Sequence, residues 1–196
     1  MNVYDFDETL FNPDSSFLFT VTCLKKYPGL FFKVFPGMAV KAVGRLLKLS
    51  TTKELKEKIF AFLPYLDDVD AEVAEFWARN GGRIEKWYLA QKRDDDLIIS
   101  ASPEFLLAPI CERLGVRLIC TKMDKHTGRI IGENCSNKEK VRRLYEEYPD
   151  AVVDEFYSDS LIDTPLAELA ASAYIVDHDR LRPWPDKNVG ADRAVH

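Results

Sequence analysis

The sequence predicts an α/β fold in which helices cover a mainly parallel sheet and a helical cap is inserted after the first strand. Short apolar segments rich in β-branched residues alternate with helical patterns through the second half of the chain, which is typical of a parallel sheet. One further apolar segment, residues 2–4, stands alone at the start. Between them, residues 12–93 carry apolar side chains at helical spacing.

The expected strands follow one another at residues 2–4, 96–100, 116–121, 151–157 and 173–176. Residues 1–11 and 94–196 would then form the core, and residues 12–93 the cap. Within the cap, helical patterns cover residues 17–26, 31–49, 52–63 and 69–92. Pro-Gly pairs and Pro64 separate these helices, and Gly81-Gly82 interrupts the last one.

Turn signals complete the prediction. Thr127-Gly128 indicates a small hairpin, and the prolines Pro183 and Pro185 indicate an irregular tail after Arg180. Because the cap is a contiguous insertion, we expect that a protein lacking residues 12–93 would remain a soluble sheet domain.

Length and composition exclude several classes of protein. At 196 residues the chain can form one domain with an insertion. Its net charge of −5 argues against a nucleic-acid-binding protein. The four cysteines lie far apart and form no metal-ligand spacing with the three histidines, so we expect reduced thiols and a cytoplasmic protein.

No membrane-spanning segment is expected. An acidic cluster follows the first four residues, where a secretory signal would have an apolar run. The longest apolar region, residues 30–49, is interrupted by Lys33, Lys41 and Arg45, so it falls short of the ~20 apolar residues that cross a bilayer.

Asp5-Phe6-Asp7-Glu8-Thr9 follows the first expected strand. Side chains two residues apart share a face of an extended chain, so the carboxylates of Asp5 and Asp7 would converge. Two close carboxylates repel unless a cation lies between them, which makes a magnesium site with oxygen ligands one interpretation. An acidic turn without a metal is the other.

Two further motifs place hydroxyl and ammonium groups near strand and helix ends. Ser100 ends the second strand, and Ser102-Pro103 is typical of a helix start, which leaves Ser100 free for a ligand at the carboxyl end of the sheet. Ser136 and Glu139 match a capping box, which puts Lys138 and Lys140 in the first turn of a helix, where a lysine can meet an anion.

The fourth motif, residues 157–163, again places two carboxylates after a strand. Asp163 precedes Thr164-Pro165 and could cap the next helix, in addition to any functional role. Asp159 has no such structural role.

The order and spacing of these four motifs resemble the haloacid dehalogenase superfamily, and specifically its phosphoserine-phosphatase-like branch. The resemblance covers nearly the whole chain: a D-x-D-x-T pattern at Asp5, a strand-ending Ser100, a lysine that opens a helix, and a D-x-x-x-D pair at Asp159. It implies a Rossmann-like sheet with a helical cap between the first and second motifs, and a Mg2+-dependent phosphomonoester hydrolase.

The resemblance also implies roles for the core residues. Asp5 would attack phosphorus and form an aspartyl-phosphate, while Asp7 would act as acid and then as base. Mg2+ would be held by Asp5, the backbone carbonyl of Asp7 and Asp159, with Asp163 orienting this shell or the lysine.

The resemblance also implies that Ser100 and a lysine bind the phosphate. The local pattern around Lys140 favours it over Lys138. Asp14 stands where phosphoserine phosphatases usually have a glutamate that reads the substrate's amino group. Two departures leave the substrate open: Glu8 replaces a small residue, and Ala101-Ser102 replaces a glycine pair.

The substrate is expected to be a small phosphate ester. Residues 27–49 mix aromatic and basic side chains, which suits either an amphipathic cap helix packed on its neighbours or a surface that contacts an anionic membrane. The second interpretation would fit a lipid phosphate such as phosphatidylglycerophosphate.

A non-catalytic phosphoacceptor of the receiver type is a further alternative. A receiver carries its aspartate on a middle strand and lacks a large helical insertion, so the sequence argues against it. The oligomeric state is not predicted.

Overall fold

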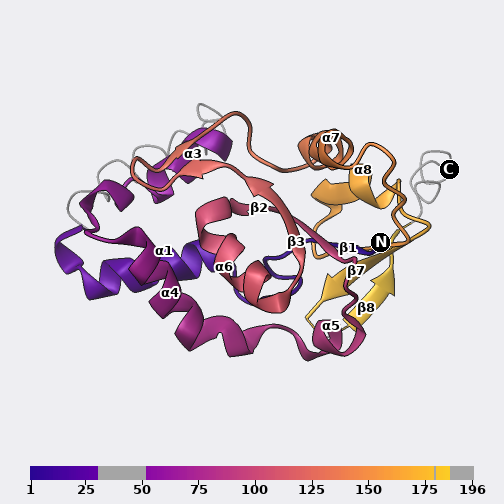
Figure 1. Cartoon of the computed structure of the whole chain (residues 1–196), viewed down its shortest axis with the longest axis horizontal. Helices are drawn as coiled ribbons and strands as arrows, with labels where there is room; N and C mark the ends of the chain where they lie inside the picture. Colours follow the sequence, from indigo (N-terminus) through magenta and orange to yellow (C-terminus); the bar gives the residue numbers. More distant parts are fainter. Residues whose placement is uncertain (31–51, 179, 186–196) are drawn as a thin grey trace, which may run out of the picture.

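The computed structural model of the chain describes residues 1–30, 52–178 and 180–185 (Figure 1). Its main sheet has the strand order β3-β2-β1-β6-β7-β8, and all neighbouring strands are parallel except β7 and β8. The strands are β1 (Val3–Tyr4), β2 (Leu97–Pro103), β3 (Arg117–Thr121), β6 (Glu155–Ser158), β7 (Ser172–Asp177) and β8 (Arg180–Pro183). The predicted α/β fold with a mainly parallel sheet is therefore confirmed.

Strand β8 corrects the expectation of an irregular tail. It runs antiparallel to β7, with Ile175 opposite Arg182 and Tyr174 opposite Pro183. Proline is tolerated in an edge strand because its missing N–H removes no hydrogen bond from the sheet interior. The next residue, Trp184, anchors the segment, since its N–H donates to the Ala173 carbonyl and its ring lies 5.7 Å from that of Phe156.

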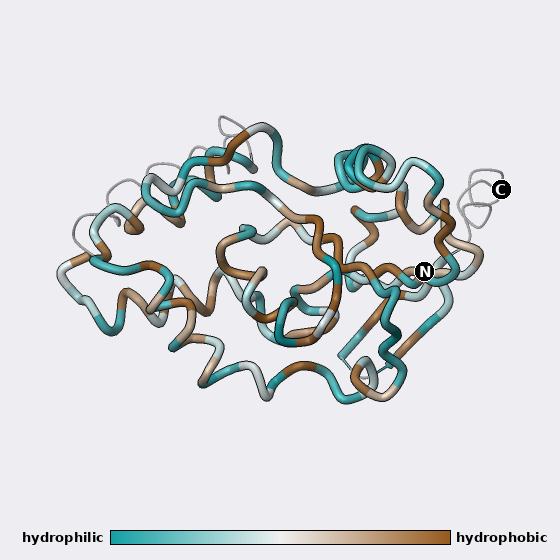
Figure 2. Tube along the Cα trace, in the orientation of Figure 1, coloured by the Kyte–Doolittle hydropathy of each residue, from teal (hydrophilic) through white to brown (hydrophobic). Residues whose placement is uncertain are grey.

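Alternating side chains give the sheet two buried faces. Val3 and Phe156 pack on one face, with Leu144 of α7 (Lys138–Glu147) and α8 (Thr164–Ala167). Their neighbours Tyr4 and Tyr157 pack on the other face, with α6 (Glu104–Leu114). Figure 2 shows the contrast between the hydrophobic strands and the largely hydrophilic α7. This is the period-two pattern of a sheet covered on both sides.

The described part of the insertion between β1 and β2 is mainly helical, as its periodicity predicts. Its elements are α1 (Ser15–Lys26), α3 (Thr52–Ile59), η1 (Leu63–Tyr65), α4 (Val69–Asn80), η2 (Gly81–Arg83) and α5 (Lys86–Gln91). The predicted break at Gly81-Gly82 separates α4 from α5. Asp14 and Asp68 cap α1 and α4 through their side chains. The helix predicted at 31–49 lies outside the described residues.

One hydrophobic core joins the insertion to the sheet. Phe76 and Trp77 of α4 belong to the same buried cluster as Tyr4 of β1 and Leu106 of α6. The indole N–H of Trp77 donates to the Leu106 carbonyl at 2.6 Å. This continuity argues against the expectation that residues 12–93 could be removed to leave a soluble sheet, because removal would expose the shared apolar surface.

The predicted hairpin consists of β4 (Met123–Asp124) and β5 (Arg129–Ile130), with Gly128 at φ 70° in the turn. It lies against α3: the Ile130 N–H donates to Glu57 at 3.0 Å, and Lys53 donates to the Gly132 carbonyl. The hairpin therefore holds α3 close to the carboxyl end of β3.

Two expectations about the whole chain can be compared with the structure. All four cysteines are free and buried. Among the described residues, none of the helices has the length and apolar character needed to cross a membrane. Most of the aromatic and basic segment 27–49 lies outside the described residues, so its membrane contact stays a prediction.

Candidate active site

The register of the parallel strands brings three of the predicted motifs together. Tyr4 pairs with Ile98 on one side and with Tyr157 on the other, and the Asp5 N–H donates to the Tyr157 carbonyl at 2.8 Å. Asp5 follows Tyr4 directly, while Ser100 and Asp159 come two residues after Ile98 and Tyr157. All three thus lie at the carboxyl ends of adjacent strands, where open α/β sheets bind ligands.

Lys140 reaches this edge from α7 and is buried, with 2% of its side chain exposed. Its Nζ lies 2.8 Å from Asp5 Oδ1 and 2.7 Å from Asp163 Oδ2. Burial alone would lower the pKa of Lys140, but the attraction of Asp5 and Asp163 raises it, so the ammonium stays charged. Lys138 is exposed. Of the two candidate lysines, only Lys140 meets the nucleophile candidate.

The predicted capping box does not form. Helix α7 begins after Asn137, whose φ of 56° turns the chain into the helix and leaves Ser136 outside the cap position. The Ser136 hydroxyl instead accepts from the Asn134 amide at 3.0 Å. Glu139 pairs with Arg142 and Arg143.

Asp163 also departs from the local expectation. It occupies the position before α8, but its side chain makes no capping hydrogen bond. Its carboxylate accepts from Lys140 and from the Ser158 hydroxyl, the latter at 2.9 Å. The charged partner outweighs the cap, because a hydrogen bond to an ammonium is stronger than one to a neutral amide.

Asp7 is held on both carboxylate oxygens. Oδ1 accepts from the Ser15 N–H at 2.7 Å, and Oδ2 accepts from the Ser102 hydroxyl. Burial, and then the charge of Asp14, raises the pKa of Asp7 to about 7, against the effect of these hydrogen bonds. An acid with such a pKa can both give and take a proton near neutral pH.

Ser102 was expected to cap α6, and this prediction is wrong. Helix α6 begins at Glu104 with Pro103 at the cap position, and β2 continues through Pro103. The Ser102 hydroxyl turns to Asp7, and its N–H donates to the Ser100 hydroxyl at 3.0 Å.

Thr9, the last residue of the D-x-D-x-T motif, fixes Asp159. The Asp159 N–H donates to the Thr9 hydroxyl at 3.0 Å, and that hydroxyl donates to Asp159 Oδ1 at 3.3 Å. Burial, and then the charge of Asp5, raises the pKa of Asp159 to about 6. Burial also raises the pKa of Asp5, against the attraction of Lys140.

These carboxylates fit a magnesium ion. Burial penalises the charged forms of both Asp5 and Asp159, and the charge of Asp5 also disfavours a charged Asp159, so a divalent cation between them would relieve these costs. Mg2+ usually takes one or two carboxylates and keeps several waters. Among the described residues, no three carboxylate, imidazole or thiolate side chains are placed to hold a metal ion together, and a site with two carboxylates, a carbonyl and waters does not require three.

A cavity of about 400 Å3 opens beside these groups. Asp5, Asp7 and Ser100 line it from the sheet. The insertion contributes Asp14, which also caps α1, together with Ser16, Phe17, Lys56, Ile59 and Phe60.

Lys56 is a site residue that sequence reasoning missed. Its Nζ donates to the Ala101 carbonyl at 2.5 Å and to Asn134 Oδ1 at 3.0 Å. Burial lowers the pKa of Lys56, against the attraction of Asp7, Asp14 and Asp5. Helix α3 carries three lysines in eight residues, and periodicity alone does not show which of them faces the site.

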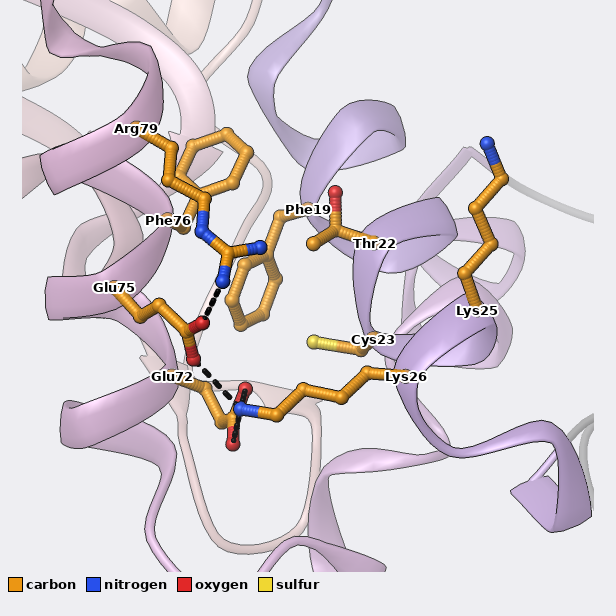
Figure 3. Close-up of a pocket in the computed structure, with 9 residues that line it drawn as sticks. All are labelled: Phe19, Thr22, Cys23, Lys25, Lys26, Glu72, Glu75, Phe76 and Arg79. Atoms are coloured by element: carbon orange, nitrogen blue, oxygen red, sulfur yellow. Dashed lines mark hydrogen bonds and ion pairs between the residues drawn. The ribbon is translucent and has the colours of Figure 1, made fainter.

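A second cavity of about 410 Å3 lies between α1 and α4 (Figure 3). Most of its charged groups pair with one another: Lys26 Nζ lies 2.8 Å from Glu72 and 2.6 Å from Glu75, which also pairs with Arg79. The Cys23 thiol points toward it, but burial raises the pKa of this thiol to about 12. This cavity therefore lacks the reactive groups of the first one.

A model of the haloacid dehalogenase-like hydrolase family matches residues 3–168. The chain belongs to this family. It is 30% identical over 192 residues to Protein CicA of Caulobacter vibrioides, covering 85% of this chain and 81% of that protein. It is also 30% identical over 115 residues to a histidinol-phosphatase of Neisseria meningitidis, covering 48% of this chain and 52% of that protein.

Solved structures share the fold. A Bordetella pertussis protein of unknown function has a TM-score of 0.71 at 21% identity, covering 98% of this chain and 94% of that one. A phosphoserine phosphohydrolase-like protein from Francisella tularensis has a TM-score of 0.52 at 17% identity, covering 88% and 86%. The resemblance to the family is confirmed, and the family is one of hydrolases. The phosphatase activity, the metal and the substrate belong to the proposal below.

Proposed function

We propose that the chain is a Mg2+-dependent phosphomonoesterase that works through an aspartyl-phosphate on Asp5. The observation that carries this proposal is the pairing of Asp5 with the buried ammonium of Lys140 at 2.8 Å. It places a fixed positive charge beside the nucleophile, and phosphoryl transfer depends chiefly on positioning and electrostatic stabilisation. The Ser100 hydroxyl, in the same cavity, would bind a phosphoryl oxygen.

Two displacements make up the reaction. A carboxylate oxygen of Asp5 attacks phosphorus, the bond to the ester oxygen breaks, and Asp7 gives its proton to the leaving oxygen. The Asp7 carboxylate then takes a proton from a water that attacks the aspartyl-phosphate, which releases Asp5 and inorganic phosphate. The pKa of about 7 at Asp7 suits both halves of this cycle.

The metal would be held by Asp5, Asp159 and the backbone carbonyl of Asp7. When bound, Mg2+ would neutralise part of the negative charge on the phosphoryl group. Hydrogen bonds within the protein hold two of the charged residues in place: Thr9 fixes Asp159, and Asp163 fixes Lys140.

The leaving group would occupy the cavity between the sheet and α3. Lys56 donates to two neutral oxygens, those of the Ala101 carbonyl and the Asn134 side chain. A leaving group with its own anionic group would therefore pair with this ammonium, while Phe17 and Ile59 would contact apolar atoms. A small organic phosphate with a second negative charge fits this description. A lipid phosphate, whose phosphodiester would supply that charge, is the second candidate.

The test of the mechanism separates Asp5 from Asp7. Each protein is mixed with an activated aryl phosphate, and intact-mass spectrometry detects an added phosphoryl group. Asp5→Asn should show no label and no turnover, because the nucleophile is gone. Asp7→Asn should be labelled and should accumulate the phosphoenzyme, because the base of the second step is missing.

Label or steady turnover on Asp5→Asn would mean that Asp5 is not the nucleophile. An Asp150→Asn protein serves as the carboxylate control, because Asp150 is exposed and does not line the cavity, and it should be labelled and released like the wild type. A panel of phosphoserine, sugar phosphates and lipid phosphates then ranks the substrate classes.

A further inference from the structure

Two serine hydroxyl groups form a hydrogen-bonded chain that ends at the carboxylate of Asp7. Ser102 Oγ donates to Asp7 Oδ2, and Ser16 Oγ lies 2.8 Å from Ser102 Oγ. Both serines are buried, with 3% and 7% of their surface exposed. They come from different parts of the chain, Ser102 from β2 and Ser16 from α1.

The contact between the Ser102 hydroxyl and Asp7 Oδ2 differs in kind from the contact between the Ser15 N–H and Asp7 Oδ1. The Ser15 N–H can only donate, so it favours an Asp7 oxygen that carries no proton. A hydroxyl both donates and accepts. Ser102 can therefore donate to the Asp7 carboxylate and accept from Ser16, or accept from a protonated Asp7 and donate to Ser16. The pair keeps a hydrogen bond to Asp7 in either arrangement.

We propose that Ser102, supported by Ser16, is the positioning residue that holds Asp7 in line with the leaving oxygen in both half-reactions. The proposal rests on the function proposed above. Ser15 and Ser102 each hold one oxygen of Asp7, so loss of the Ser102 hydroxyl would leave the carboxyl group free to rotate away from the leaving oxygen. Ser102 touches Asp7 and acts through it, while its backbone N–H separately supports Ser100.

Leaving-group dependence tests this role, since an acid matters most when the leaving oxygen is a poor one. In Ser102→Ala, kcat/KM should fall about 10–100-fold for phenyl phosphate, a part of the ~10²–10⁴-fold that a general acid supplies. For dinitrophenyl phosphate, whose leaving group needs no proton, kcat/KM should stay within about threefold. The phosphoenzyme measured by intact mass should also accumulate, because the base of the second step is less well held.

Matched variants separate positioning from packing. Ser102→Thr keeps the hydroxyl and should restore the wild-type leaving-group dependence. Ser16→Ala keeps the Ser102 donor but removes its partner, so it should change the dependence in the same direction by a smaller factor. This second variant also tests the proposal if Ser102→Ala does not fold, as judged from its thermal melting.

Equal losses for both esters in Ser102→Ala and Ser16→Ala would overturn the inference, because they would indicate packing or phosphate binding. Unchanged kinetics in both variants would overturn it too. A wild-type protein without label on Asp5 would overturn the proposed function and this inference together. A labelled wild type whose leaving-group dependence matches that of Ser102→Ala would overturn this inference alone.

Discussion

A buried lysine is stable only when it is fully paired, and Lys140 meets this condition with two carboxylates. The same contacts orient Asp5, which leaves its other carboxylate oxygen for a metal or for phosphorus. Asp159 completes the arrangement, because it is fixed by Thr9 and interacts electrostatically with Asp5. Asp5, Lys140 and Asp159 are thus each held by a neighbouring side chain.

Asp159 gives a pH-dependent prediction for the metal. In the metal-free protein its pKa is about 6, above the ~3.9 of an unfolded chain. This group therefore contributes stability below about pH 4 and loses that contribution as the pH rises through about 6. Because Mg2+ binds the ionised carboxylate, the rise in Tm caused by Mg2+ should be small near pH 5 and larger at about pH 7.5.

Differential scanning fluorimetry with and without Mg2+ measures this effect without any substrate. Asp159→Asn should show little Mg2+ response at either pH. An equal rise in Tm at both pH values, or one retained by Asp159→Asn, would contradict the assignment of the metal site.

Sequence reasoning found the residues whose role depends on strand ends. Asp5, Ser100 and Asp159 could be placed together because each follows an apolar strand, and the carboxyl ends of parallel strands share one edge. Ser102 could not be placed in this way. Its local signal, a serine before proline, predicted a helix cap, while its actual partner Asp7 lies 95 residues away in the sequence. Tertiary hydrogen bonds of this kind override local preferences and leave no local pattern.

At the scale of elements, the hairpin β4–β5 holds α3 over the site. The predicted turn at Gly128 is present, but its contact with α3 had no sequence signal. Gly128 has a φ of 70°, and a Cβ there would lie 2.4 Å from the Phe60 carbonyl oxygen. Only glycine permits this close approach, so the hairpin turn and the end of α3 depend on each other.

Gly128→Ala should therefore displace α3 and lower the stability. Gly132→Ala is the matched control, because Gly132 also has a positive φ, 79°, and a Cβ there meets nothing within 4 Å. Both variants incur about 1–2 kcal/mol of backbone strain. Gly128→Ala should cost about 1–3 kcal/mol more because of the clash.

Thermal melting of the two variants measures the difference, at about 2–4 °C per kcal/mol for a protein of this size. Equal melting temperatures of Gly128→Ala and Gly132→Ala would contradict this prediction, because they would show that the hairpin accommodates the added methyl group without displacing α3.

At the scale of the whole molecule, the insertion and the sheet share one core. Trp77 of α4 packs edge-on against Phe6 and Phe11, at centroid distances of 5.9 and 5.1 Å, and both phenylalanines lie in the segment after β1. Its indole N–H reaches across to α6. The contiguous sequence of residues 12–93 suggested a separable cap, but contiguity in sequence carries no information about which surfaces are buried together.

The last prediction concerns a protein in which a short Gly-Ser linker replaces residues 12–93. Removal would expose buried side chains of the sheet domain that now contact the insertion, among them Tyr4, Leu106 and Ile110. Each such side chain contributes about 1.5–3 kcal/mol by burial. We therefore expect the truncated protein to be insoluble or to lack a cooperative melting transition. The full chain should melt in one transition, because a shared core couples both parts. A soluble truncated protein with a sharp transition of its own would show that the sheet buries its apolar surface without the insertion.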